Sequence, residues 1–216
     1  MTPDERTIET TIHGRYLVEA KRAGLPLLVG FHGYGESAED AFARLQSLAG
    51  SDLWIRLAIQ GLHRFYRRRT NEIVASWMTS QDRTHAIADN IQYTSKIIES
   101  VCQEFSAAKT VILSGFSQGV AMAYRCAAGL ERSVSGIIAL GGDIPPELDS
   151  ISLSRIPAAL IGRGVRDEWY TEEKLKADEQ RLRAAGVKVK VLTFDAGHEW
   201  NVEFTEAASR FLTSIA

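Results

Sequence analysis

The sequence predicts an α/β fold in which helices cover both faces of a mainly parallel β-sheet. Short apolar runs bounded by glycine or proline, such as residues 26–31 and 111–116, are typical of strands buried on both faces. These runs alternate with segments whose apolar residues recur at helical spacing, the pattern that a parallel sheet requires. A length of 216 residues with 45% hydrophobic content fits one compact core, so we expect a single domain over residues 1–216.

The first half of the chain opens the sheet. Residues 7–20 contain β-branched residues and a glycine break, which predicts an opening hairpin. The apolar runs at 26–31 and 53–59 predict two strands. Between them a helix is expected over residues 37–49, because Ser37 and Asp40 have the spacing of a capping box.

Residues 61–84 show no helical or strand period. A segment of this length without secondary structure is uncommon inside a compact domain and often forms a binding loop or lid. After it, apolar residues at 87, 91, 98, 101 and 105 lie on one helical face and predict an amphipathic helix.

The second half alternates regularly between strands and helices. Strands are expected at residues 111–116, 134–140, 158–162 and 187–194, and helices at residues 118–129, 171–185 and 199–215. Little chain remains for a cap domain, so the predicted fold has a minimal cap or none.

Composition excludes several classes of protein. The formal charge of −2 argues against a nucleic-acid partner, since such proteins usually carry a basic excess. No apolar stretch approaches the roughly 20 residues of a membrane span, and the first residues lack the apolar core of a signal peptide. Cys102 and Cys126 are expected to be buried free thiols, which suits the cytoplasm. No Cys/His cluster has metal-binding spacing, so neither a metal nor another cofactor is expected.

A nucleophile motif follows the predicted strand at 111–116. Residues 115–119 read GFSQG, which matches G-x-S-x-G, with Ser117 at its centre. A serine at a sharp strand-to-helix turn needs small neighbours two residues away, and Gly115 and Gly119 supply them. The motif therefore predicts an α/β-hydrolase fold in which Ser117 is the nucleophile.

The general base is found by order along the chain. In this fold the acid and then the histidine follow the nucleophile. Of five histidines only His198 lies after Ser117, in a loop directly after the last predicted strand. A neutral imidazole can accept the serine proton near pH 7, so we expect His198 to be the base.

Four carboxylates compete for the role of the acid that orients His198. Asp167 follows the strand before the last helix–strand unit, where a carboxylate can reach the histidine, and we expect it to be the acid. Asp143 follows the preceding strand and is the main competitor. Asp195 lies in the loop of His198 itself, where a facing hydrogen bond is awkward, and Asp178 falls inside a predicted helix and is expected to be solvated.

Two backbone amides are expected to form an oxyanion hole. One donor in this fold is the residue after the nucleophile, here Gln118. The other comes from the loop after an early strand, where residues 31–35 read FHGYG, and Tyr34 is the candidate. His32 is expected to hold this loop by hydrogen bonds rather than to take part in catalysis.

The blocks FHGYGESAED, GFSQGV, GRGVRDEW and AGHEW together resemble the phospholipase/carboxylesterase family, which includes acyl-protein thioesterases. The resemblance runs from Phe31 to Trp200. It implies that Ser117, Asp167 and His198 form a catalytic triad, and that the Tyr34 and Gln118 amides bind the oxyanion.

The sequence departs from the family pattern at four places. Val120 replaces a glycine, Arg163 replaces a histidine, and Tyr34 stands where leucine is common. Of a Trp-Phe-Asp stretch that lines the acyl site in the family, only Trp77 remains. These departures leave the chemistry intact and bear on the substrate.

The segment over residues 61–84 carries aromatic and basic side chains. By resemblance it borders the substrate groove, with Trp77 and Met78 as an apolar wall; Trp77 could instead be a core anchor. The basic residues of the segment are interpreted as a solvated face or as an attraction for anionic substrates; they are Arg64, Arg67, Arg68 and Arg69.

The predicted reaction is hydrolysis of a small carboxylic ester or thioester through an acyl-enzyme intermediate. Acyl-protein thioesterase or lysophospholipase activity would use the same residues. An amidase on the same fold, or a binding protein on a catalytically inactive hydrolase fold, are the remaining alternatives.

Overall fold

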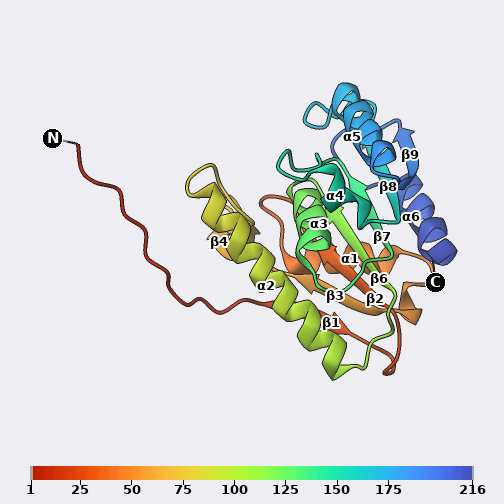
Figure 1. Ribbon diagram of the computed structural model, residues 1–216, viewed down its shortest axis with the longest axis horizontal. Helices are drawn as coiled ribbons and strands as arrows, with labels where there is room; N and C mark the ends of the chain where they lie inside the picture. The colour runs from red at the N-terminus through yellow and green to blue at the C-terminus, as the bar shows by residue number, and fades with distance from the viewer. Residues whose placement is uncertain (1, 216) are drawn as a thin grey trace.

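Figure 1 shows the computed structural model, which describes residues 2–215 and is built around one seven-stranded sheet. The strand order is β1-β3-β2-β6-β7-β8-β9, and every neighbouring pair is parallel except β1 with β3. The strands are β1 (Tyr16–Glu19), β2 (Leu27–Phe31), β3 (Ile55–Ile59), β4 (His63–Tyr66), β5 (Ile73–Ser76), β6 (Val111–Phe116), β7 (Gly136–Leu140), β8 (Ala158–Gly164) and β9 (Lys188–Phe194). The predicted mainly parallel sheet is confirmed.

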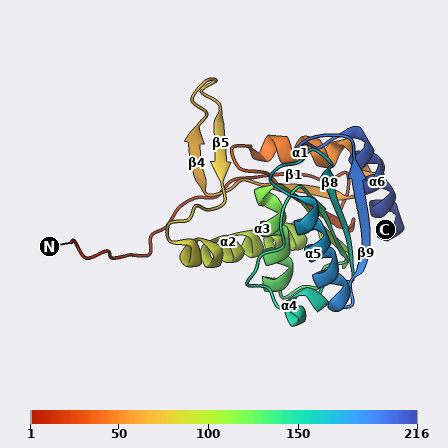
Figure 2. The same cartoon turned by 90° about the horizontal axis from the view of Figure 1, so that it is seen from above.

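Helices cover both faces of the sheet (Figure 2). They are α1 (Ala38–Ser47), α2 (Arg83–Glu104), α3 (Gln118–Gly129), α4 (Ser150–Ser154), α5 (Glu172–Ala184) and α6 (Val202–Ile215), with a 3-10 turn η1 (Ser51–Leu53) before β3. Side chains of α2, α3, α4 and α5 share one apolar core with the sheet, and side chains of α1 and α6 share the other. The predicted fold class, an α/β-hydrolase architecture with helices on both faces of a mainly parallel sheet, is confirmed.

The central strands are apolar throughout because each of their faces meets a helix layer. In β2 all five residues are buried: Leu27, Val29 and Phe31 join the core of α2 and α3, while Leu28 joins the core of α1 and α6. Successive side chains of a strand point to opposite faces, so a continuous apolar run fills both cores.

None of the described helices is both long and apolar enough to cross a bilayer.

The predicted opening hairpin over residues 7–20 is wrong. Only Tyr16–Glu19 forms a strand, and it pairs with β3 at the edge of the sheet. The preceding residues are exposed and extend away from the body of the protein in Figure 1. Their two larger apolar side chains, Ile8 and Ile12, are 93% and 55% exposed and give a second strand no face to bury.

The segment over residues 61–84 is not a structureless loop. Strands β4 and β5 form an antiparallel hairpin that projects from the sheet (Figure 2). All four residues of β4 are exposed, so no side has to be apolar and the alternation that identifies a strand is absent. The arginine-rich tip closes through the amide of Arg67, which donates to the carbonyl of Glu72.

The remaining helices and strands lie close to their predicted positions. The capping box is present, since the Asp40 amide donates to the Ser37 hydroxyl and the Asp40 carboxylate accepts from the Ser37 amide. Helix α2 begins four residues before the first apolar residue of its predicted face, and α4, a five-residue helix capped by Asp149, was not predicted. Both cysteines are buried free thiols, as expected.

Candidate active site

Ser117 lies at a sharp turn between β6 and α3. Its backbone has φ 52° and ψ −120°, a conformation that residues other than glycine rarely adopt. Gly115 and Gly119 make the turn possible, because a Cβ on Gly115 would lie 2.5 Å from the carbonyl oxygen of Gly119. A Cβ on Gly119 would lie 2.2 Å from the carbonyl oxygen of Phe31, at the end of β2. The elbow is therefore pressed against the neighbouring strand.

Replacing Gly119 with alanine is expected to destabilise the protein by about 1–3 kcal/mol, because the new methyl group meets backbone that must shift. Urea unfolding measures the change. Gly197→Ala is the matched control, since a Cβ on Gly197 meets no atom within 4 Å. Equal stability of the two variants would contradict the packing argument.

The structure brings Ser117, His198 and Asp167 into one hydrogen-bonded chain. His198 Nε2 lies 2.8 Å from the Ser117 hydroxyl oxygen, and His198 Nδ1 lies 2.7 Å from Oδ2 of Asp167. The other carboxylate oxygen of Asp167 accepts from the amides of Trp169 and Tyr170, both at 2.9 Å. With the proton on Nδ1 directed at the carboxylate, Nε2 is free to accept the serine proton.

The other three carboxylates have different partners. Asp143 pairs with Lys174 at 3.1 Å, and the exposed Asp195 pairs with Arg166. The expectation that Asp178 is solvated is wrong: it is buried and accepts from the Ile144 amide and the Tyr170 hydroxyl. Among residues 2–215, Asp167 is the one carboxylate that hydrogen-bonds His198.

Two features around Ser117, Asp167 and His198 were not recognised from the sequence. Arg163, which departs from the family pattern, is buried and donates to the carbonyls of Tyr170 and Asp167, so it holds the loop that carries the acid. Gly141 and Gly142 follow β7; Gly141 has φ 68°, and a Cβ on Gly142 would lie 2.3 Å from the Ser117 carbonyl oxygen. The double glycine was the signal that this loop passes close to the nucleophile.

The loop after β2 lies beside Ser117, as the predicted oxyanion hole requires. A Cβ placed on Gly33 would lie 3.3 Å from the Cβ of Ser117. The Gly33 amide donates to Glu36, whose carboxylate also pairs with Arg44, and the Gly35 amide donates to the carbonyl of Ala75. These bonds fix the loop on both sides of Tyr34.

The amides of Tyr34 and Gln118 are available to a ligand. Within residues 2–215 neither N–H has a hydrogen-bond acceptor. The Gln118 side chain makes other hydrogen bonds. Its oxygen accepts from the backbone N–H of Trp77, and its NH₂ group donates to the carbonyl of Met78. It thereby ties the segment after β5 to the start of α3.

His32 holds the loop after β2 by hydrogen bonds, as expected. Its Nδ1 lies 2.7 Å from the carbonyl oxygen of Gly33, and its Nε2 accepts from the Gly61 amide at 2.9 Å. This pattern requires a neutral imidazole with its proton on Nδ1. Burial lowers the pKa of His32 below its ordinary value of about 6.5.

The lowered pKa of His32 predicts a loss of stability in acid. Below about pH 6.5 the unfolded chain binds a proton at this histidine before the folded chain does, so the free energy of unfolding falls as the pH falls. His32→Gln is expected to unfold more easily at pH 7.5 and to lose less stability than wild type between pH 7.5 and 5.5 in urea titrations. His85→Gln, on the exposed start of α2, is the control. A variant with the wild-type pH dependence would exclude His32 as the cause.

The apolar-wall interpretation is wrong for Trp77. Its side chain has no exposed surface, stacks on His32 with 5.0 Å between ring centroids, and donates to the His32 carbonyl at 2.8 Å. It is the core anchor that the alternative interpretation expected. Met78 is also buried, and its sulfur contacts the guanidinium groups of Arg83 and Arg125.

Ser117 opens into a pocket of about 520 Å³ between the start of α3, the loop after β7 and the start of α5. Its lining includes Arg83, Arg125 and the exposed side chain of Trp169, which sequence reasoning did not place at the site. A separate pocket of about 840 Å³ lies between the hairpin and α1, and Arg64 and Arg67 line that one. Arg67 pairs there with Glu72, so the arginine run does not face Ser117.

Within residues 2–215 no group of three or more His, Cys, Asp or Glu side chains is arranged to hold a metal ion.

Solved structures of several esterases share this fold. A Bacillus cereus carboxylesterase is 16% identical with a TM-score of 0.72, and the match covers 94% of this chain and 95% of that one. Zea mays acyl-protein thioesterase 2 is 19% identical with a TM-score of 0.71, covering 94% and 99%. A protein of unknown function from Agrobacterium tumefaciens is 24% identical with a TM-score of 0.69, covering 93% and 96%.

Among curated proteins none matches the sequence. The family model described as Phospholipase/Carboxylesterase matches residues 14–216. That match contains both glycine-rich loops, the elbow at Ser117 and the segments that carry Asp167 and His198. The chain belongs to the phospholipase/carboxylesterase family.

Proposed function

We propose that the protein is a serine hydrolase that cleaves carboxylic esters or thioesters through an acyl-enzyme intermediate. The observation that carries this proposal is the hydrogen-bonded chain from Ser117 through His198 to Asp167, with distances of 2.8 and 2.7 Å. Its position at the carboxyl ends of parallel strands, beside two unpaired amides, supports the same chemistry.

In the proposed mechanism His198 Nε2 removes the proton of Ser117 as the hydroxyl oxygen attacks the substrate carbonyl. The amides of Tyr34 and Gln118 donate to the carbonyl oxygen as it becomes negative. The bond to the leaving group breaks, and His198 returns the proton to the departing oxygen or sulfur. Water then attacks the acyl-serine by the same route and releases the acid. Asp167 holds the imidazole in its tautomer throughout.

The pocket favours short substrates with polar groups. It measures about 520 Å³, and its apolar lining is interrupted by the charged side chains of Arg83, Arg125, Lys174 and Arg181. Esters of short acids are therefore the first substrate class. Thioesters are the second candidate, favoured by the similarity to Zea mays acyl-protein thioesterase 2.

A fluorophosphonate probe and a p-nitrophenyl ester series from two to twelve acyl carbons test the proposal together. We expect the wild type to be labelled, Ser117→Ala to remain unlabelled, and kcat/KM to be highest for the short esters. Matching p-nitroanilides separate an esterase from an amidase. A folded wild-type protein that is not labelled and hydrolyses no ester or thioester would instead indicate a binding protein on a hydrolase fold.

A cytoplasmic location is part of the proposal. It is supported by Cys102 and Cys126, which are both buried and free, as is usual in a reducing compartment.

A further inference from the structure

Two arginines meet in the wall of the pocket that holds Ser117. Arg125 lies on α3, eight residues after the nucleophile, and Arg83 is the first residue of α2. Nη1 of Arg125 lies 3.5 Å and Nη1 of Arg83 lies 3.7 Å from the same atom, the sulfur of Met78. A thioether is a weak acceptor, so this contact leaves Nη1 of both guanidinium groups able to bind a stronger acceptor.

Arg125 is held in place from behind. Its side chain is 2% exposed, and the Glu147 carboxylate lies 2.7 Å from its Nε and 2.6 Å from its Nη2, which holds and compensates the guanidinium. Burial lowers the pKa of Arg125, and the charge of Arg83 acts in the same direction. Side chains of a helix lean toward its N-terminus, which directs the Arg125 guanidinium back toward the end of α3 where Ser117 lies.

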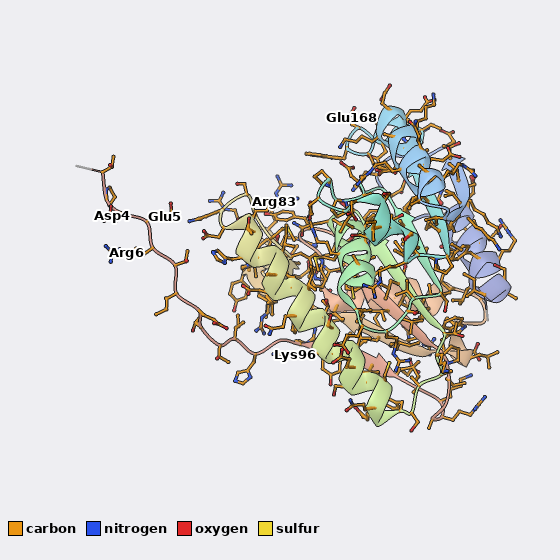
Figure 3. All side chains as sticks on the ribbon, viewed as in Figure 1. Asp4, Glu5, Arg6, Arg83, Lys96 and Glu168 are labelled. Atoms are coloured by element: carbon orange, nitrogen blue, oxygen red, sulfur yellow. The ribbon has the colours of Figure 1, made fainter. Side chains whose placement is uncertain are left out.

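Arg83 has no carboxylate partner among residues 2–215. It is the first residue of the 22-residue helix α2 (Figure 3) and follows the N-cap residue Asp82, which makes no side-chain hydrogen bond to the helix. The N-terminal end of a helix carries positive partial charge, so a cation there is unfavourable. This position and the neighbouring Arg125 both leave the Arg83 charge uncompensated.

The other two cations of the pocket are already compensated. Lys174 pairs with Asp143 at 3.1 Å and donates to the carbonyl of Trp169. Arg181 pairs with Asp178 at 3.6 Å and donates to three backbone carbonyls. Glu147 likewise compensates Arg125, so among the described residues Arg83 is the one cation of the pocket without a carboxylate partner.

We propose that Arg83 and Arg125 form an anion subsite that selects esters or thioesters carrying a second, negatively charged group, a carboxylate or a phosphate. This inference rests on the proposed function and specifies its substrate class. Guanidinium groups bind carboxylate and phosphate oxygens through paired hydrogen bonds. The anion would supply the acceptor that Arg83 lacks and would orient the scissile carbonyl toward Ser117. The arginine run of the hairpin has no part in this subsite.

Matched substrate pairs test the inference. On the acyl side, monoethyl glutarate is compared with the neutral ethyl pentanoate in a pH-stat. On the leaving-group side, 4-acetoxybenzoate and 4-acetoxyphenyl phosphate are compared with 4-methylphenyl acetate, which also separates carboxylate from phosphate. We expect wild type to prefer the charged member of at least one pair in kcat/KM, and Arg83→Gln to lower that preference about tenfold, mainly through KM.

The control is Arg68→Gln, which removes the same charge from the exposed tip of the hairpin and should leave the preference unchanged. Arg83→Glu should reverse the preference. If wild type hydrolyses esters but Arg83→Gln and Arg68→Gln have the same preference for every pair, the anion subsite is excluded while the proposed function stands.

A binding measurement separates the remaining outcomes. Calorimetry measures the affinity of Ser117→Ala, and of the double variant Ser117→Ala/Arg83→Gln, for monoethyl glutarate and 4-acetoxyphenyl phosphate. Because neither protein has the Ser117 hydroxyl, binding is measured without turnover. Binding that weakens with Arg83→Gln supports the subsite even if wild type hydrolyses no ester, in which case only the proposed hydrolase activity fails. Absence of both binding and preference overturns the subsite.

Discussion

Ser117→Ala is expected to lower kcat for a short p-nitrophenyl ester by about 10⁴- to 10⁶-fold, because the bond-forming oxygen is lost while the pocket remains. The remaining rate would come from the Tyr34 and Gln118 amides and from substrate binding, so KM should change little. Stopped-flow burst kinetics check the mechanism: the wild type should release a burst of nitrophenol as the acyl-enzyme forms, and the variant should not.

The strained backbone of Ser117 provides a second readout. At φ 52° both serine and alanine are unfavourable, whereas glycine is not. Ser117→Gly should therefore be as inactive as Ser117→Ala. In urea unfolding it should be more stable than both the wild type and Ser117→Ala, by about 1 kcal/mol. If Ser117→Ala keeps more than about one hundredth of wild-type kcat, Ser117 is not the nucleophile.

Asp167→Asn is expected to lower kcat by about 10⁴-fold with little loss of stability. The asparagine oxygen can still accept from the amides of Trp169 and Tyr170, which now bond Oδ1 of Asp167. Its NH₂ group then faces His198 Nδ1 and favours the tautomer with the proton on Nε2. That proton occupies the atom which should accept the proton of Ser117, so the base is disabled although the geometry remains.

Asp195→Asn is the matched control for this prediction. Asp195 was a competitor for the role of the acid and lies in the loop of His198, yet its carboxylate pairs with the exposed Arg166. The control should retain kcat within a few-fold, since surface ion pairs contribute at most about 1 kcal/mol. A larger loss in Asp195→Asn than in Asp167→Asn would reverse the assignment of the acid.

Local patterns in the chain were sufficient to predict the fold class and the elbow at Ser117. Strands such as β2 and β6 are apolar along their whole length because both faces are buried, and this composition can be recognised without tertiary information. The elbow at Ser117 depends on glycines two residues away on either side, so its signal is also local. His198 was found because chain order in this fold leaves one histidine after the nucleophile.

Exposed elements and the stretch before β1 were harder to predict from the sequence. Strand β4 has no buried face, so nothing in its composition distinguishes it from a loop. The stretch before β1 contains β-branched residues, but its described residues are exposed and pair with no strand, although β1 lies at the edge of the sheet. Strand propensity without a partner does not produce a strand.

The sequence by itself determined the order of the buried strands and main helices, the elbow at Ser117 and the role of His32 as a loop anchor. Only the tertiary structure decided which carboxylate meets His198, that Trp77 is buried, and which arginines line the pocket of Ser117. The physical reason is that these contacts join segments far apart in the chain: Arg83 and Arg125 meet over Met78 because α2 packs beside α3. No local period or motif predicts such a contact between distant segments. The residues that surround the Ser117 elbow are brought to it only when the sheet and its helices pack together.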